Sequence, residues 1–171
     1  MNLPIRLGSK DIALIGMMVA TIEAAKVSLS FLPNIELVSL LVILYTLFFK
    51  RKAVYAIFIF ILMEGFLYGF GIWWFGYLYV WPILAFITHL CRQHTEPMFW
   101  ATLSGFYGLV FGGLFAIPYF FLSGYQAGMT YWISGIPYDI AHCIGNFTLA
   151  LVLFRPLYRI LQKVSRMNHE I

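Results

Sequence analysis

Asp139, His142 and Asn146 place three different hydrogen-bonding side chains in one apolar stretch near the end of the 171-residue chain. Their spacing of three and then four residues puts them on one face of a helix. A carboxylate, an imidazole and an amide on one face can together accept hydrogen bonds from a polar ligand and donate to it. His142 can equally bond one helix to another, so the stripe predicts either a binding site or a polar helix contact.

Two earlier apolar stretches also carry ionisable side chains. Glu64 and Tyr68 are four residues apart and share a helix face, and Glu23 stands three residues before Lys26. Ionisable groups in apolar segments normally line a cavity or pair with one another, because an isolated charge there is costly. We therefore expect all four in a substrate site, with a purely structural Glu23–Lys26 ion pair as the alternative.

Polar and aromatic residues at the ends of the apolar stretches extend this candidate site. Asn34 and Glu36 stand between the first two stretches. Aromatic rings can stack on a flat ligand or face a cation, although Trp and Tyr also form belts at membrane surfaces. The aromatic residues that we predict to bind substrate are Trp73, Trp74, Tyr77, Tyr131, Trp132 and Tyr138.

Motifs for catalysis are missing from the sequence. His142 has no second histidine at the spacing of a His-Glu-x-x-His zinc site, and neither a nucleophile elbow nor a phosphate-binding loop occurs. Gly108 and Gly112 have the small-residue spacing that lets two helices pack closely. The sequence therefore predicts no catalytic residue, no metal ligand and no cofactor, and a protein that is not an enzyme.

The composition indicates the medium in which these residues fold. Apolar residues make up 62% of the chain and charged residues 11%. A soluble domain carries about 25% charged residues, and one of this size cannot bury so many large apolar groups. We therefore predict an integral membrane protein whose exterior contacts membrane lipid.

Six apolar stretches are candidates to position the polar residues. A helix needs about 20 apolar residues to cross the hydrocarbon layer. We predict an all-α fold, a six-transmembrane-helix bundle that forms a single domain over residues 1–171. The expected spans are Asp11–Phe31, Glu36–Phe49, Ala53–Ile72, Tyr77–Arg92, Pro97–Ser123 and Ile136–Arg159.

The basic residues predict the orientation of this bundle. Ten of the eleven Lys and Arg residues fall at alternating span ends, on what would be one side of the membrane. Because Lys and Arg concentrate in cytoplasmic loops, both termini are expected in the cytoplasm, and no nucleic acid is needed to explain the basic charge. At about 1.5 Å rise per residue, Glu23, Glu64 and Asp139 then lie in the outer half of the membrane. The candidate site is thus predicted there.

The first predicted helix carries a ridge of small residues. Gly16, Ala20 and Ala24 follow at four-residue steps, with Ala13 beside them. Such a ridge lets another helix approach closely. That helix belongs either to this bundle or to a partner, and spacing leaves both open.

The sequence resembles the substrate-binding S components of energy-coupling factor (ECF) transporters. The resemblance rests on six predicted helices in 171 residues, the small-residue first helix, the segment 134–146 (SGIPYDIAHCIGN) and the junction 32–36 (LPNIE). It implies a multi-pass protein of the bacterial cell membrane that captures a vitamin-like micronutrient in an outer-half pocket. The implied partners are an ECF transmembrane coupling subunit, which docks on the small-residue ridge, and two cytoplasmic ATPase subunits.

The nature of the ligand is left open by the residues. The excess of acidic and aromatic groups favours a donor-rich or cationic molecule with flat rings, such as cobalamin, a pyridoxine- or pyrimidine-like vitamin, or a ribazole-like precursor. Two rival functions remain. A proton-coupled carrier would load a proton on Glu64 or Asp139, and a membrane-embedded enzyme would use Glu64 and His142 as acid and base.

Overall fold

The computed structural model describes residues 7–169, with the side chains of 168 and 169 left out. Within this range the chain is entirely helical, which confirms the predicted all-α class, and it contains six helices. They are α1 (Ser9–Ser28), α2 (Val38–Phe49), α3 (Arg51–Tyr68), α4 (Ile72–Leu90), α5 (Pro97–Leu122) and α6 (Tyr125–His169).

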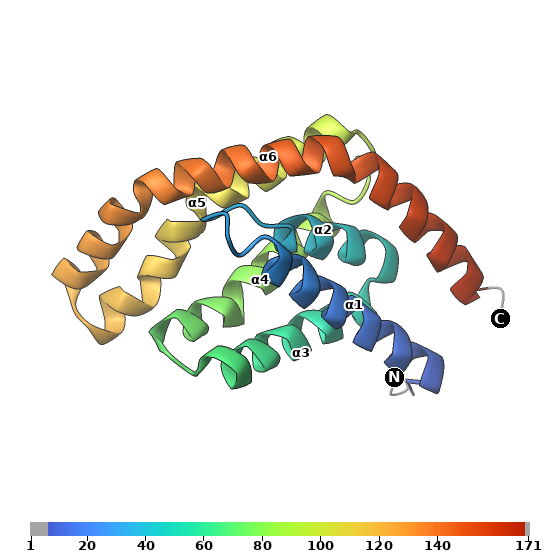
Figure 1. Cartoon of the computed structure of the whole chain (residues 1–171), viewed down its shortest axis with the longest axis horizontal. Coiled ribbons are helices and arrows are strands. Elements are labelled where there is room, and N and C mark those ends of the chain that lie inside the picture. Colours follow the sequence, from blue (N-terminus) through green and yellow to red (C-terminus); the bar gives the residue numbers. More distant parts are fainter. Residues whose placement is uncertain (1–6, 170–171) are drawn as a thin grey trace.

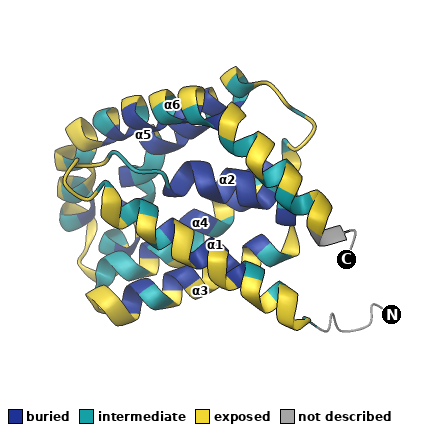
Figure 2. Ribbon diagram, turned by 45° about the vertical axis from the view of Figure 1, so that its right-hand side comes forward, coloured by how far each residue is buried: buried dark blue, intermediate teal, exposed yellow. Residues whose placement is uncertain are grey.

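The short helix α2 forms the centre of the molecule. Ten of its twelve residues are buried, including Ser39 and Thr46. A helix that is apolar on all sides is stable only when neighbours surround it. Here α2 contacts α1, α3, α4 and α6, and Figure 2 shows it as the continuously buried segment.

Helices α5 and α6 form a long antiparallel pair along one side of the molecule (Figure 1). Glycines on α5 allow the close approach. A Cβ on Gly108 would stand 2.9 Å from the backbone of His142, and one on Gly105 would stand 2.9 Å from Phe147. The small-residue seam predicted around Gly108 therefore packs α5 against α6.

Two predicted helix starts differ from the structure. Helix α6 begins at Tyr125, well before the predicted Ile136, because the turn needs only Ser123 and Gly124, whose φ of +87° suits glycine. Pro137 lies inside this helix and does not end it. Helix α4 begins at Ile72 and not at Tyr77, since the glycine-rich break is confined to residues 69–71.

Membrane spanning is supported most directly for the α5–α6 pair. These two helices are long and apolar enough to cross a bilayer, whereas α2 is apolar but shorter. Large apolar side chains also lie on the exterior, among them Phe31, Phe66 and Phe121, which are 73%, 78% and 84% exposed. The full count of six spans stays a prediction.

The basic residues of the described chain, apart from Lys26, gather at one end of the molecule. Lys52 forms a 2.5 Å ion pair with Asp11, which joins the start of α3 to the start of α1. The α2–α3 turn with Lys50 and Arg51 shares a cavity wall with His89 at the end of α4. The start of α1 and the C-terminal stretch of α6 lie toward the same end (Figure 1). We call this the basic end; Arg6, also predicted there, lies outside the described residues.

We predict that a larger side chain at position 108 destabilises the contact between α5 and α6. Gly108→Leu should lower the free energy of unfolding by about 1–3 kcal/mol, because the side chain collides with the backbone of α6. Gly16→Leu is the control, since a Cβ on Gly16 has no neighbour within 4 Å. Thermal unfolding in detergent measures both variants. Equal melting temperatures for the two would contradict this packing.

Candidate functional site

Two neighbouring cavities lie at the end of the molecule opposite the basic end. The first, which we call the loop cavity, has a volume of about 360 Å³ and lies under the α1–α2 loop, residues 29–37. The second, the α5–α6 cavity, has a volume of about 370 Å³. Asn34 and Phe111 line both cavities, so the two adjoin.

Eight of the fifteen predicted substrate-binding residues line these cavities. The loop cavity is lined by Lys26, Asn34, Glu36, Tyr77 and His142 among others. The α5–α6 cavity is lined by Asn34, Tyr131, Tyr138 and Asp139 among others. The remaining seven line neither cavity; they are Glu23, Glu64, Tyr68, Trp73, Trp74, Trp132 and Asn146.

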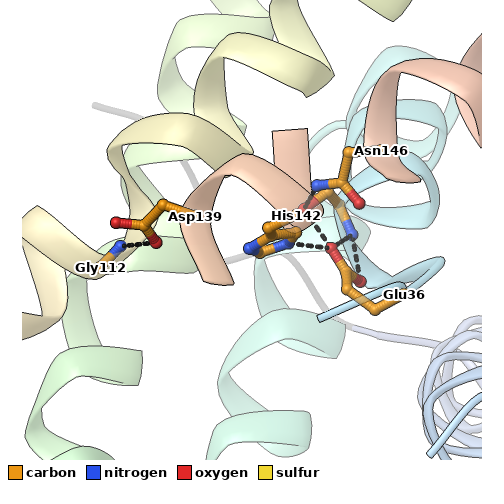
Figure 3. Close-up of polar contacts among 6 residues, drawn as sticks. Glu36, Gly112, Asp139, His142 and Asn146 are labelled. Atoms are coloured by element: carbon orange, nitrogen blue, oxygen red, sulfur yellow. Dashed lines mark hydrogen bonds and ion pairs between the residues drawn. The ribbon is translucent and has the colours of Figure 1, made fainter. Parts of the chain in front are cut away.

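A buried polar network ties the α1–α2 loop to α2 and α6 (Figure 3). His142 Nε2 lies 3.2 Å from Glu36 Oε1. The Ser39 backbone N–H donates to Glu36 Oε2 at 3.0 Å, and its hydroxyl donates to Oε1 at 2.6 Å. Asn146 Nδ2 donates to Ser39 Oγ at 3.2 Å. Ser39, His142 and Asn146 are at most 4% exposed, so these bonds form away from solvent.

Glu36 is the centre of this network. Its carboxylate accepts a backbone N–H in the first turn of α2, where a negative charge also complements the helix dipole. Burial raises the pKa of this loop carboxyl, but the hydrogen bond and charge of His142 and the bonds from Ser39 outweigh it and lower the pKa below its usual value. The ionised carboxylate is thus the form that the site favours.

Asp139 lies one turn before His142 on α6 and faces α5. The Gly112 backbone N–H donates to Asp139 Oδ1 at 2.9 Å (Figure 3). A Cβ at Gly112 would collide with the Asp139 carboxylate, so only glycine leaves room for it. Gly112, which the spacing assigned to helix packing alone, is also part of the site.

The predicted stripe of Asp139, His142 and Asn146 has two different surroundings. Asp139 and His142 each line a cavity. Asn146 is 2% exposed and bonds Ser39 in the contact between α6 and α2. Asn146 therefore lines neither cavity and supports the Glu36 network through its hydrogen bond to Ser39.

Lys26 pairs with a partner that differs from the predicted one. It forms its ion pair with Glu64 of α3, which is fully buried, and not with Glu23. Glu23 instead accepts a 3.2 Å hydrogen bond from the Tyr68 hydroxyl, and the Lys26 ammonium lies 4.2 Å from the centre of the Tyr68 ring. This cluster joins α1 to α3, and only Lys26 reaches the loop cavity.

The predicted aromatic residues divide into cavity walls and helix contacts. Tyr77 lines the loop cavity and packs edge-on against Trp73, with 5.4 Å between ring centres. Tyr131 lines the α5–α6 cavity and stacks on Tyr119 at 4.2 Å. Trp74 Nε1 donates to the Ile61 carbonyl at 2.8 Å, which fastens α4 to α3.

Some cavity residues are absent from the sequence-based prediction. Phe111 lines both cavities and packs edge-on against His142, with 4.7 Å between ring centres. Trp81 lines the loop cavity beside Tyr77. Phe111 stands in an apolar run between two packing glycines, where nothing in the sequence separates a cavity wall from a lipid contact.

The small-residue ridge of α1 faces outward. Ala13, Gly16, Ala20 and Ala24 are all exposed. The opposite face of α1 carries the buried residues Ile15, Met18, Val19 and Ile22. The ridge therefore packs against no other described helix, which leaves it available to a partner.

The acidic side chains in and beside the two cavities already have partners. Glu36, Asp139 and Glu64 already accept hydrogen bonds or pair with a cation. Among the described residues, no three His, Cys, Asp or Glu side chains gather in a way that would hold a metal ion. No known family, curated protein or solved structure matches the chain.

We expect the Glu36–His142 contact to hold the loop over its cavity. His142→Ala should increase amide hydrogen exchange in residues 29–37 by about ten- to a hundredfold, because a buried hydrogen bond to a charged group is lost. Asp139→Ala is the control, because Asp139 bonds Gly112 and not the loop. Loop exchange that is unchanged in the first variant, or raised equally in both, would contradict this role of His142.

Proposed function

We propose that this chain is the substrate-capture subunit of an ATP-driven importer in the bacterial cell membrane, similar to the S components of ECF transporters. The observation that carries the proposal is the pair of adjoining cavities, which together contain eight of the predicted substrate-binding residues. The loop cavity lies under the α1–α2 loop, and both cavities lie opposite the basic end. A pocket at one end with its polar groups already hydrogen-bonded suits capture of a ligand more than its conversion.

The proposed placement in the membrane follows from charge and exposure. The basic end would face the cytoplasm, since Lys and Arg concentrate on that side. Both termini would then be cytoplasmic, and the cavities would open toward the outside. The exposed phenylalanines and the long apolar α5 and α6 would contact lipid. All six helices would belong to one membrane-embedded bundle.

The cavities favour a small ligand with flat rings. Tyr77, Trp81 and Phe111 offer ring faces and edges in the loop cavity. The two carboxylates that line the cavities are Glu36 and Asp139, and each already accepts a hydrogen bond from the protein. These bonds do not cancel a negative charge, so a ligand with hydrogen-bond donors suits the cavities. Each cavity of about 360–370 Å³ has the size of a small-molecule site, and suits one or two rings better than a corrin. A pyridoxine-, pyrimidine- or ribazole-like molecule therefore fits better than cobalamin.

The outward small-residue ridge supports docking of a coupling subunit. Gly16 has no neighbour within 4 Å of an added Cβ, so a helix of another protein can approach the backbone of α1. The ridge lies on the face of α1 away from the core, so a docked helix would not need to disturb the cavities. Two cytoplasmic ATPases would supply the energy through that coupling subunit.

One observation favours the proton-coupled carrier as a second candidate. Glu64 is fully buried, and its Oε1 has no hydrogen-bond partner among the described residues. Such an oxygen is a site where a proton can be loaded. The carrier would take up substrate with no ATPase present. The enzyme alternative has less support, because Glu64 pairs with Lys26 and lines neither cavity.

We predict that bulk on the ridge separates binding from transport. Gly16→Trp should leave ligand binding by the isolated chain intact, because Gly16 lines neither cavity and faces outward. Uptake driven by ATP in vesicles, and co-purification with the coupling subunits, should fall together. Phe106→Trp is the control, since Phe106 is 64% exposed on α5, away from the ridge.

Three results would separate the alternatives. Loss of ligand binding in Gly16→Trp would mean that the ridge serves the bundle itself. Full uptake by the parent chain without any ATPase would establish the carrier in place of the importer subunit. A chemically changed product would establish the enzyme.

A further inference from the structure

A groove of about 670 Å³ lies at the basic end, larger than either cavity described above. It runs between the first turn of α5 and the part of α6 around Pro156. Figure 1 shows α6 bending in this C-terminal part, beside the start of α5. A proline inside a helix removes a backbone hydrogen bond and bends the helix, which here opens space beside α5. The groove is lined by Thr95, Glu96, Pro97, Met98, Leu151, Phe154, Arg155, Tyr158 and Arg159.

The floor of the groove is apolar and firmly packed. Phe154 is 1% exposed and stacks on Trp100, with 6.1 Å between ring centres. Trp100 Nε1 in turn donates to the His94 carbonyl at 3.0 Å, which fixes the segment before α5. Met98 and Leu151 extend the apolar surface to the exterior, where they are 56% and 39% exposed. The groove is therefore preformed and continuous with the apolar outside of the bundle.

The rim of the groove is positively charged. Arg155 and Arg159 are one helical turn apart and exposed, and neither forms an ion pair with a described residue. Glu96 is the one acidic side chain in the lining, and its carboxylate accepts the Thr95 backbone N–H. The first backbone N–H groups of α5 add partial positive charge at the same place. The rim thus offers two guanidinium groups that lack a partner of opposite charge.

We infer that this groove binds an anionic phospholipid of the cytoplasmic leaflet. The phosphate would lie between Arg155 and Arg159, because guanidinium groups bind phosphate oxygens with paired hydrogen bonds. An acyl chain would follow Met98 and Leu151 down the apolar exterior. A phospholipid can occupy both the charged rim and the apolar floor of the groove, whereas a soluble anion would contact the rim alone. The inference depends on the proposed membrane placement and not on the ligand of the two cavities.

The test is native mass spectrometry of the full-length chain in detergent, with phosphatidylglycerol or phosphatidylcholine added. The parent should retain one phosphatidylglycerol in preference to phosphatidylcholine. The double variant Arg155→Gln/Arg159→Gln should weaken that retention by about tenfold or more. The matched control is Lys163→Gln/Arg166→Gln, which removes the same charge from exposed positions of the same helix outside the groove. It should retain the lipid like the parent.

Each alternative gives a distinct result. Equal loss in both double variants would show unspecific attraction to the basic end and overturn the site. Equal retention of the two lipids, or no retention by the parent, would overturn it as well. Displacement by glycerol phosphate at matched concentration would identify a soluble phosphate site instead. If Arg155→Gln/Arg159→Gln retained the lipid like the parent but no longer co-purified with the coupling subunits, the groove would be a protein contact and the lipid site would be overturned. If the two cavities proved to bind no ligand, the lipid result would still stand, because the groove shares no residue with either cavity.

Discussion

The buried contact between Glu36 and His142 connects parts of the chain that are 106 residues apart, and the candidate site depends on it. The Glu36 carboxylate accepts a backbone N–H in the first turn of the central helix α2, and its partner His142 stands on α6. The α1–α2 loop is thereby held over the loop cavity. A charged group in this position is stable only because Ser39 and His142 complete its hydrogen bonds. Loss of one partner would leave an unpaired buried group and free the loop.

The glycines of α5 set the second condition for the site. Gly108 lets the backbone of α6 approach, and Gly112 both leaves room for Asp139 and donates a hydrogen bond to it. The spacing of these glycines predicts close packing, because a helix face without Cβ atoms lets the backbone of another helix approach. The Asp139 carboxylate fills the gap beside Gly112 because α6 is rotated so that Asp139 faces α5. The spacing of the glycines alone does not determine this rotation.

The sequence predicts the helical class, and more than half of the residues that it assigns to substrate binding do line the cavities, because helical periodicity places polar groups on shared faces. It fails where the answer depends on the neighbouring helix. Lys26 has Glu23 within reach on its own helix, yet pairs with Glu64 across the bundle. Asn146 shares the stripe of His142 but faces α2. Phe111 is one apolar residue among many until the fold places it between two cavities.

Under the proposed function, this chain captures a small molecule without changing it. The most direct measurement is liquid chromatography with mass spectrometry of the small molecules released from the purified full-length chain. We expect one bound compound with one or two flat rings, at near-equal molar amount, recovered unchanged after prolonged incubation with the protein. Its retention should fall when Phe111, which lines both cavities, is replaced by alanine. Conversion of the compound during incubation would contradict capture without chemistry, and equal retention by the Phe111→Ala variant would contradict binding in the two cavities.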